Sequence, residues 1–344
     1  MKKYLLPRDG NFYKANLHCH STISDGKWTI EEIKKNYKDN GYSVVAFTDH
    51  DVFIPHNDLT EEDFLALNGY ELAITENKHW VDSPKTCHIC FIALDRDRRI
   101  QRIYYDTAHL RNNIAAACLD GERDYINNRN YTPEFISEIM REGRNDGFFV
   151  TYNHPEWSLE TADEYMNYHG MHAMEIVNYG CVATGYDDRN GKIYDRMLRG
   201  GEDIFCTAND DNHDRYPIDH PKNDSFGGFT MIKADKLDYT SVTNALLAGN
   251  FYASEGPEIH ELWYEDGKVH IRCSEAHRIV MTADCRYNKC LTAEKKGEAL
   301  TEAAFTIRSC YGRFVRFTVY SYDGKMANTH AYFLKDFYQG ENED

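Results

Sequence analysis

Short apolar segments that end in polar side chains recur along the first two thirds of the chain. They cover residues 13–21, 42–50, 69–75, 87–94, 148–155, 172–178 and 203–211. Apolar runs of this length, bounded by turn residues, are typical of strands. We therefore predict seven strands in this part of the chain.

Segments with helical spacing lie between these strands. Residues 29–41 place apolar side chains on one face, with Thr29 as the expected N-cap. Residues 132–143 repeat the arrangement, with Thr132 as the cap and a proline in the first turn. Residues 97–119 form a longer stretch with helical spacing, which we predict as a helix within one loop.

Strand and helix in alternation predict an α/β fold with a parallel sheet. Seven such repeats over about 250 residues indicate a closed or nearly closed barrel, in which chemistry takes place at the carboxyl ends of the strands. After residue 253 the pattern changes to strand alternation with Gly-containing turns. We predict a barrel domain over residues 1–253 and a small all-β, sandwich-like domain over residues 254–344.

Composition narrows the choice of partners and compartment. The 344 residues include 39 Lys and Arg against 56 Asp and Glu, a formal charge of -17 that makes long nucleic acid a poor partner. Apolar runs stay well below the ~20 residues that span a bilayer, and the first one ends at Pro7, too early for a signal peptide. Ten irregularly spaced cysteines then indicate free thiols and a cytoplasmic protein. Nothing in the sequence sets the oligomeric state.

The candidate chemistry lies in histidines and carboxylates near the strand ends. His18 and His20 leave the same face of a strand, although 16 histidines in 344 residues produce about one such pair by chance. The joint pattern is more informative, and its members are His18, His20, Asp25, His50, Glu71, His88, His154, Asp211 and His213. Nine such groups converging without a counter-cation would be costly. A cluster of Zn²⁺, Mn²⁺ or Fe²⁺ suits these mixed nitrogen and oxygen ligands.

The ordered motifs HxH, SDG, TDH, GxE, H, HP and DxH resemble the polymerase-and-histidinol-phosphatase (PHP) superfamily of metal-dependent phosphoesterases over roughly residues 12–235. The SDGKWTIEEI and TDHD contexts, with the β-rich tail, look most like the stand-alone members grouped with carbaryl-type metallohydrolases. The resemblance implies a distorted seven-stranded, TIM-like (β/α) barrel that holds three divalent metals.

The resemblance also implies a role for each residue. The first metal would be held by His18, His20, Glu71 and Asp211. The second would share Glu71 as a bridge and add His88 and His154. The third would be held by Asp25, His50 and His213. Glu71, His88, His154 and Asp211 would be the catalytic group, with Glu76 beside His79 as the alternative to Glu71.

Charge counting then predicts the reaction. Three dications against three carboxylates leave about three positive charges, which match a phosphomonoester dianion, and a bound water with its pKa lowered towards ~7 supplies the hydroxide nucleophile. We therefore expect a hydrolase of small phosphate esters. The alternatives are an ester or carbamate hydrolase with the same site, a nucleotide phosphodiesterase or exonuclease, and a binding role for the β-rich tail.

Weaker candidates surround this set. The sequence does not identify the proton donor to the leaving group, and His79 and Tyr152 are the candidates. Phosphate contacts could come from Arg189, Lys192 or Arg196. Asp49 and Asp51 flank His50 and are candidates to orient ligands, while Asn153 and Trp157 flank His154 and are candidates to line the pocket.

Overall fold

The computed structural model describes residues 2–76, 85–101, 130–295 and 297–337. His79 and most of the helix predicted over residues 97–119 lie outside these ranges, and the described residues 97–101 are not helical. None of the described helices is both long and apolar enough to cross a bilayer.

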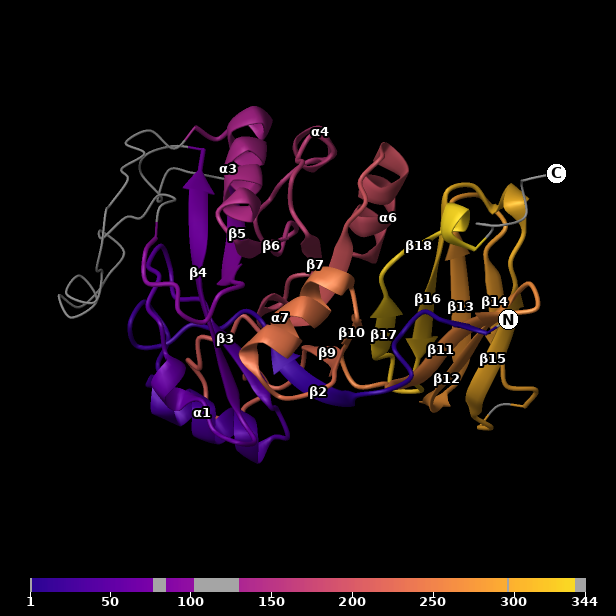
Figure 1. Cartoon of the computed structure of the whole chain (residues 1–344), viewed down its shortest axis with the longest axis horizontal. Helices are drawn as coiled ribbons and strands as arrows, with labels where there is room; N and C mark the ends of the chain where they lie inside the picture. The colour runs from indigo at the N-terminus through magenta and orange to yellow at the C-terminus, as the bar shows by residue number, and fades with distance from the viewer. Residues whose placement is uncertain (1, 77–84, 102–129, 296, 338–344) are drawn as a thin grey trace.

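A single large sheet runs through the molecule (Figure 1). Seven of its strands come from the first two thirds of the chain and lie side by side in chain order: β2 (Asn11–Asn16), β3 (Val44–Phe47), β4 (Leu65–Thr75), β5 (Thr86–Ala93), β6 (Phe148–Tyr152), β7 (Ala173–Asn178) and β8 (Phe205–Asn209). All seven predicted strand segments therefore contain a strand. On the other side of β2 the sheet continues through β9 (Phe229–Ala234) and β10 (Phe251–Ser254), both antiparallel to their neighbours.

The sheet is mixed, which corrects the prediction of parallel strands throughout. Strands β2, β3 and β4 are parallel, as are β6, β7 and β8, but β5 is antiparallel to both β4 and β6. The physical reason is the short connection between Thr75 and Thr86. Ten residues separate these two positions, fewer than the dozen or more that a parallel crossover requires.

The two ends of this seven-strand run meet just beyond β2 and β8. A parallel bridge joins Cys19 to Asn212, and the amide of Asp211 donates to the carbonyl of His18 at 3.0 Å. Among the described residues, β2 and β8 share no longer ladder, because β2 pairs along its length with β9. The fold is thus a mixed α/β sheet whose ends touch, and the closed barrel stays a prediction.

In the described part of the chain, six helices accompany these strands: α1 (Ile30–Asp39), α3 (Pro133–Asn145), α4 (Ala162–Tyr165), α5 (Tyr179–Thr184), α6 (Gly191–Gly200) and α7 (Tyr239–Ala248). The two shorter predicted helices are confirmed as α1 and α3. Thr29 forms a capping box with Glu32 at the start of α1, and Thr132 accepts from the amide of Phe135 at the start of α3.

The described residues after β10 form strands joined by turns and short 3-10 helices. One sheet contains β1 (Lys3–Tyr4), β11 (Ile259–Glu265), β12 (Lys268–Ala276) and β15 (Leu300–Thr306). Facing strands extend the large sheet: β13 (Arg278–Ala283), β14 (Lys289–Thr292), β16 (Phe314–Tyr320), β17 (Met326–Thr329) and β18 (Tyr332–Phe333). Side chains from both sheets, such as Ile271 and Phe317, share one apolar core, as in a sandwich.

Pairing continues across the predicted domain boundary at residue 253. Strand β10 pairs with β9 on one edge and with β17 on the other, and Lys3 near the N-terminus pairs with Tyr264. A buried ion pair of 2.6 Å joins Arg316 of β16 to Asp195 of α6. The two parts are therefore joined through one sheet. Their division into separate domains, residues 1–253 and 254–344, stays a prediction.

Candidate metal centre

All nine predicted ligand residues lie in one cluster where the ends of β2 and β8 meet. They form four overlapping groups whose candidate ligand atoms lie within 4.8 Å of one another: His20, Asp25, His50 and His213; His18, Glu71 and His154; His18, His20 and Asp211; and His50, Glu71 and His88. The structure thus brings together residues that are up to 195 positions apart in the sequence.

Glu71 lies at the middle of this cluster. Its Oε1 is 3.0 Å from His18 Nε2, 3.2 Å from His88 Nδ1 and 3.3 Å from His154 Nε2. Its Oε2 is 3.2 Å from His50 Nδ1. A carboxylate that contacts imidazoles from four separate segments is placed to join two metal groups, the role that the family resemblance implies.

The alternative carboxylate does not share this position. Glu76 follows the end of β4 and is exposed, whereas Glu71 is 1% exposed. Glu71 is therefore the member of this pair that lies in the cluster.

A second, also buried part of the cluster is formed by His18, His20 and Asp211. Asp211 Oδ1 is 3.2 Å from His18 Nε2 and 3.0 Å from His20 Nε2, and the two imidazole nitrogens are themselves 3.1 Å apart. We call this part, together with Glu71 and His154, the closed side of the centre. None of its five side chains is more than 10% exposed.

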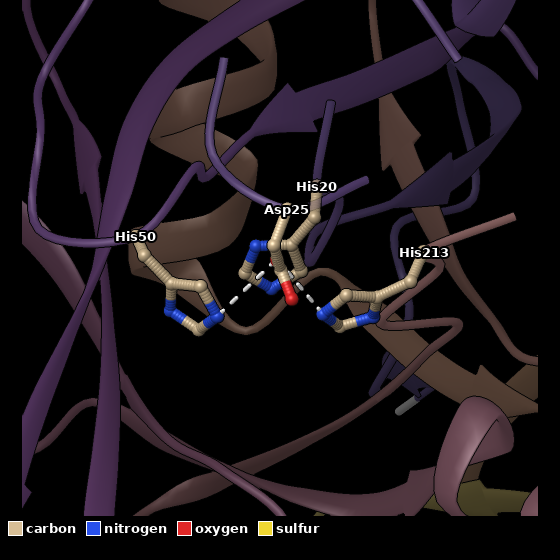
Figure 2. A group of neighbouring side chains, drawn as sticks. All are labelled: His20, Asp25, His50 and His213. Atoms are coloured by element: carbon tan, nitrogen blue, oxygen red, sulfur yellow. Dashed lines mark ion pairs between the residues drawn. The ribbon is translucent and has the colours of Figure 1, made fainter. Parts of the chain in front are cut away.

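The other part, which we call the open side, consists of Asp25, His50 and His213 (Figure 2). Asp25 Oδ1 lies between the two imidazoles, 3.2 Å from His213 Nε2 and 3.6 Å from His50 Nε2. The ring of His20 stacks on that of His213 at 4.5 Å and so connects the two sides. The side chains of the three open-side residues are each about a fifth exposed.

The antiparallel β5 corrects one premise of the sequence prediction. His88 lies near the beginning of β5 rather than at its carboxyl end, and Glu71 lies within β4 rather than after it. Because β5 runs opposite to its neighbours, its beginning lies at the edge of the sheet where β6 ends. His88 therefore reaches the same place as His154, which follows β6.

Backbone strain is concentrated at the ligands. Asp211 and His154 have φ values of 53° and 26°, and Asp51, next to His50, has a φ of 59°. Left-handed φ costs a side-chain-bearing residue of order 1–3 kcal/mol and is found where the surrounding structure holds it for a function. Here it turns side chains at the strand ends towards the cluster.

Glu175 is a functional candidate that the sequence analysis missed. It lies in β7, is fully buried, and its Oε1 is 2.9 Å from His18 Nδ1. Neutral His18 then carries its proton on Nδ1 and directs the Nε2 lone pair at the cluster, the arrangement typical of a metal-ligating histidine. The amides of Asn178 and Asn209 donate to the two Glu175 oxygens at 3.0 and 2.9 Å.

Asn153 and Asp49, two of the weaker candidates, hold the ligands in place. Asn153 Nδ2 donates to Glu71 Oε1 at 2.9 Å. Asp49 is buried and accepts from the amide and hydroxyl groups of Ser21 and Ser24, so it fixes the loop that carries Asp25.

The buried carboxylates of the centre stabilise positive charge on their neighbours. Burial lowers the pKa of His154, but the Glu71 and Asp211 carboxylates outweigh burial and raise that pKa to about 9. Burial likewise lowers the pKa of His18, and its neighbouring carboxylates raise it well above its usual value. His88 shows the opposite result, since burial lowers its pKa to about 4 despite Glu71. Protons on some imidazoles thus supply the charge that cations would bring.

The residues present fit divalent cations. Five buried ligand-type atoms form no hydrogen bond of good geometry: His20 Nδ1, Asp25 Oδ1, Glu71 Oε2, His88 Nδ1 and Asp211 Oδ1. All except His20 Nδ1 lie within ion-pair distance of another candidate ligand. Leaving buried polar atoms unpaired costs about 1–3 kcal/mol each, more for charged groups. Nitrogen and carboxylate oxygen atoms that face one another at about 3 Å are the donor set that Zn²⁺, Mn²⁺ or Fe²⁺ prefers.

Tyr152 and Trp157, two further weak candidates, both contact residues near the centre. Tyr152 donates its hydroxyl to Glu160 at 2.6 Å, which does not support its role as the proton donor. Trp157 packs edge-on against His154 and at a tilt against His88, with centroid distances of 5.0 and 5.3 Å.

The basic residues near α6 make contacts elsewhere. Arg189 pairs with Glu255 at 2.7 Å, and Arg196 donates to the hydroxyl of Tyr165 at 2.9 Å. No ion pair or hydrogen bond joins these described arginines to the nine ligand residues.

Neither a family model nor a curated protein matches the chain. Among the solved structures that match, one is a two-domain protein containing a predicted PHP-like metal-dependent phosphoesterase from Bacteroides vulgatus, with 14% identity, coverage of 96% of this chain and 98% of that chain, and a TM-score of 0.43. A second is a proposed metal-dependent phosphoesterase from Bifidobacterium adolescentis, with 16% identity, coverage of 60% and 89%, and a TM-score of 0.38.

A third is an amidohydrolase from Chromobacterium violaceum with bound sulfate, with 15% identity, coverage of 58% and 87%, and a TM-score of 0.36. At these identities and TM-scores, a functional proposal has to rest on the geometry of the metal centre. The resemblance to the carbaryl-type group stays a prediction.

Proposed function

We propose that this protein is a metal-dependent phosphoesterase of the PHP type that hydrolyses small phosphate monoesters. The observation that carries the proposal is the cluster of six histidines and three carboxylates, centred on Glu71 and Asp25, whose ligand-type atoms face one another. The reaction adds water across the P–O ester bond and releases inorganic phosphate and an alcohol.

Three divalent cations, each Zn²⁺, Mn²⁺ or Fe²⁺, fit the number and type of ligands. The closed side would hold two, with Glu71 between them, and the open side would hold the third through Asp25, His50 and His213. When bound, such cations lower the pKa of a coordinated water and balance charge on phosphoryl oxygens.

The protein's own residues prepare this site in three ways. Glu175 keeps the proton of His18 on Nδ1, and Asn153 fixes the rotamer of Glu71. Asp49 holds the loop that positions Asp25. The catalytic set proposed from the sequence, Glu71, His88, His154 and Asp211, lies on or beside the closed side, where burial excludes bulk water.

A phosphomonoester matches the charge of such a centre better than a neutral ester. Glu175 adds a fourth buried carboxylate next to the three ligands, so the net positive charge of a loaded centre is one lower than the sequence analysis predicted. The charge still has the sign that attracts a dianion in a chain of net charge -17.

The test uses the full chain loaded with Mn²⁺. Turnover of p-nitrophenyl phosphate is compared with turnover of naphthyl acetate, a naphthyl carbamate and bis(p-nitrophenyl) phosphate. We expect the monoester to give the highest kcat/KM. Preference for the acetate or carbamate would favour the ester or carbamate hydrolase, and preference for the diester would favour the phosphodiesterase.

A further inference from the structure

The open side of the centre has one cationic side chain at its rim. Arg215 Nη2 lies 3.1 Å from Asp25 Oδ2, on the oxygen that does not face the two imidazoles. Arg215 is 57% exposed, whereas Asp25 is 18% exposed. Within the described residues, no other lysine or arginine forms an ion pair with any of the nine ligand residues.

The backbone beneath Arg215 is held firmly although its side chain is exposed. Asp224 accepts from the amides of His213 and Asp214 at 2.8 and 3.0 Å, and Ser225 Oγ donates to Asp214 Oδ1 at 2.6 Å. Asp214 has a left-handed φ of 54°, which these bonds stabilise. The chain therefore places the Arg215 guanidinium at a defined point beside the opening.

The ion pair with Asp25 uses only one of the N–H donors of the Arg215 guanidinium. The structure gives Arg215 one side-chain hydrogen bond, from Nη2 to Asp25, and a guanidinium has five N–H donors. An exposed ion pair contributes only about 0–1 kcal/mol, whereas the planar fork of an arginine forms two parallel, charge-assisted bonds to a phosphate. Arg215 can thus exchange Asp25 for phosphoryl oxygens at little cost.

The closed side offers no comparable approach. Its side chains are nearly inaccessible, so among the described residues the face formed by Asp25, His50 and His213, with Arg215 at its rim, is the more accessible one for a phosphoryl group. Lys222, seven residues further along the same exposed loop, instead lies near the ring of Tyr216.

We propose that Arg215 binds the phosphoryl group of the substrate at the open side and makes the enzyme selective for terminal phosphomonoesters over diesters. A monoester dianion presents three non-bridging oxygens and two negative charges, whereas a diester presents two oxygens and one charge. The Arg215 guanidinium at the open side, with its two parallel N–H donors, therefore favours the monoester. This inference rests on the proposed function and specifies the substrate class of the same site.

The test compares Arg215→Ala and Arg215→Lys with wild type, and Lys222→Ala is the matched control that removes one positive charge from the same loop. Binding of inorganic phosphate to each Mn²⁺-loaded protein is measured by calorimetry, beside metal content. KM and kcat are measured with p-nitrophenyl phosphate and with bis(p-nitrophenyl) phosphate.

We expect Arg215→Ala to weaken phosphate binding about 10- to 100-fold, as the loss of a charge-assisted pair does. Metal content should stay at the wild-type level, KM for the monoester should rise more than KM for the diester, and Arg215→Lys should recover only part of the loss. Lys222→Ala should bind phosphate as wild type does.

Two results would overturn the inference. One is an unchanged phosphate affinity in Arg215→Ala, or an equal loss in Lys222→Ala. The other is a loss of affinity that follows a loss of metal and is recovered by excess Mn²⁺, because Arg215 would then act only by holding Asp25. Failure of the wild type to release phosphate from any monoester would reject the proposed function instead, and the calorimetry separates the two cases.

Discussion

The closed and open sides of the metal centre use the same kinds of ligand in different surroundings. On the closed side, His18 is fully buried, and Glu175 and Asn153 bond to the outer faces of its ligands. On the open side, Asp25 and His213 are each about a fifth exposed, and the exposed, charged Arg215 is the outer partner. Under the proposed function, the closed side would hold ions tightly and the open side would admit an anion.

The largest expected effect comes from matched removal of one negative charge on each side. Glu71→Gln takes away the carboxylate shared by two ligand groups, so we expect metal content to fall and kcat/KM to drop by roughly 10³-fold or more. Asp25→Asn makes the same chemical change on the open side. There we expect about a 10²-fold drop that excess Mn²⁺ largely restores.

Elemental analysis and p-nitrophenyl phosphate turnover over a series of Mn²⁺ concentrations distinguish the two variants. Equal losses, or a Glu71→Gln enzyme that recovers as readily as Asp25→Asn, would remove the distinction between the two sides. Circular dichroism checks that both variants are folded.

A smaller effect is expected behind the closed side. Glu175→Gln keeps the shape of the side chain but weakens the acceptor that holds the Nδ1 proton of His18. We expect metal affinity to fall about 10- to 100-fold, as is usual when a partner of a ligating histidine is lost. Competition with a chelator measures the affinity, and Glu160→Gln, another buried glutamate, is the control. Equal metal affinity in Glu175→Gln and wild type would contradict the role.

The smallest expected effect is on the stability of the fold and comes from Glu160. The closed-side carboxylates contact imidazoles, whereas Glu160 contacts tyrosine hydroxyls. Burial raises its pKa from 4.5 to about 7, although hydroxyls of Tyr152 and Tyr168 oppose the shift. The folded state therefore loses stability as pH rises from about 4.5 to 7, where the unfolded chain ionises more readily. Glu160→Gln should be free of this loss.

We accordingly expect Glu160→Gln to gain stability relative to wild type by roughly 1–3 kcal/mol between pH 5 and pH 8. Urea unfolding at both pH values measures the difference. If the difference in unfolding free energy between Glu160→Gln and wild type does not change with pH, or changes in the opposite direction, Glu160 is already ionised at pH 5.

The local parts of this structure were predictable from the sequence, whereas the long-range parts were not. The capping box of Thr29 and Glu32 involves residues three apart, so the pattern alone located the start of α1. The direction of β5 depends on how it pairs with β4 and β6, and the apolar pattern of a strand is the same in either direction.

The candidate site shows the same contrast. The nine candidate ligands could be predicted together because their motifs occur in a recognisable order. Glu175 belongs to no motif, and its partner His18 lies 157 residues away, although a single acidic residue inside an otherwise apolar strand could have indicated a buried partner. Arg215 was overlooked in favour of Arg189 and Arg196, because the distance of a basic residue from the centre is set by tertiary structure.

Metal content is the most direct test of the claim that imidazoles and carboxylates from separate strands hold several cations together. The full chain, purified without chelator and dialysed against Mn²⁺ or Zn²⁺, should retain more than one equivalent of metal, and Glu71→Gln should retain fewer. Wild-type protein that retains no metal after this treatment, with the same result for Glu71→Gln, would contradict the claim.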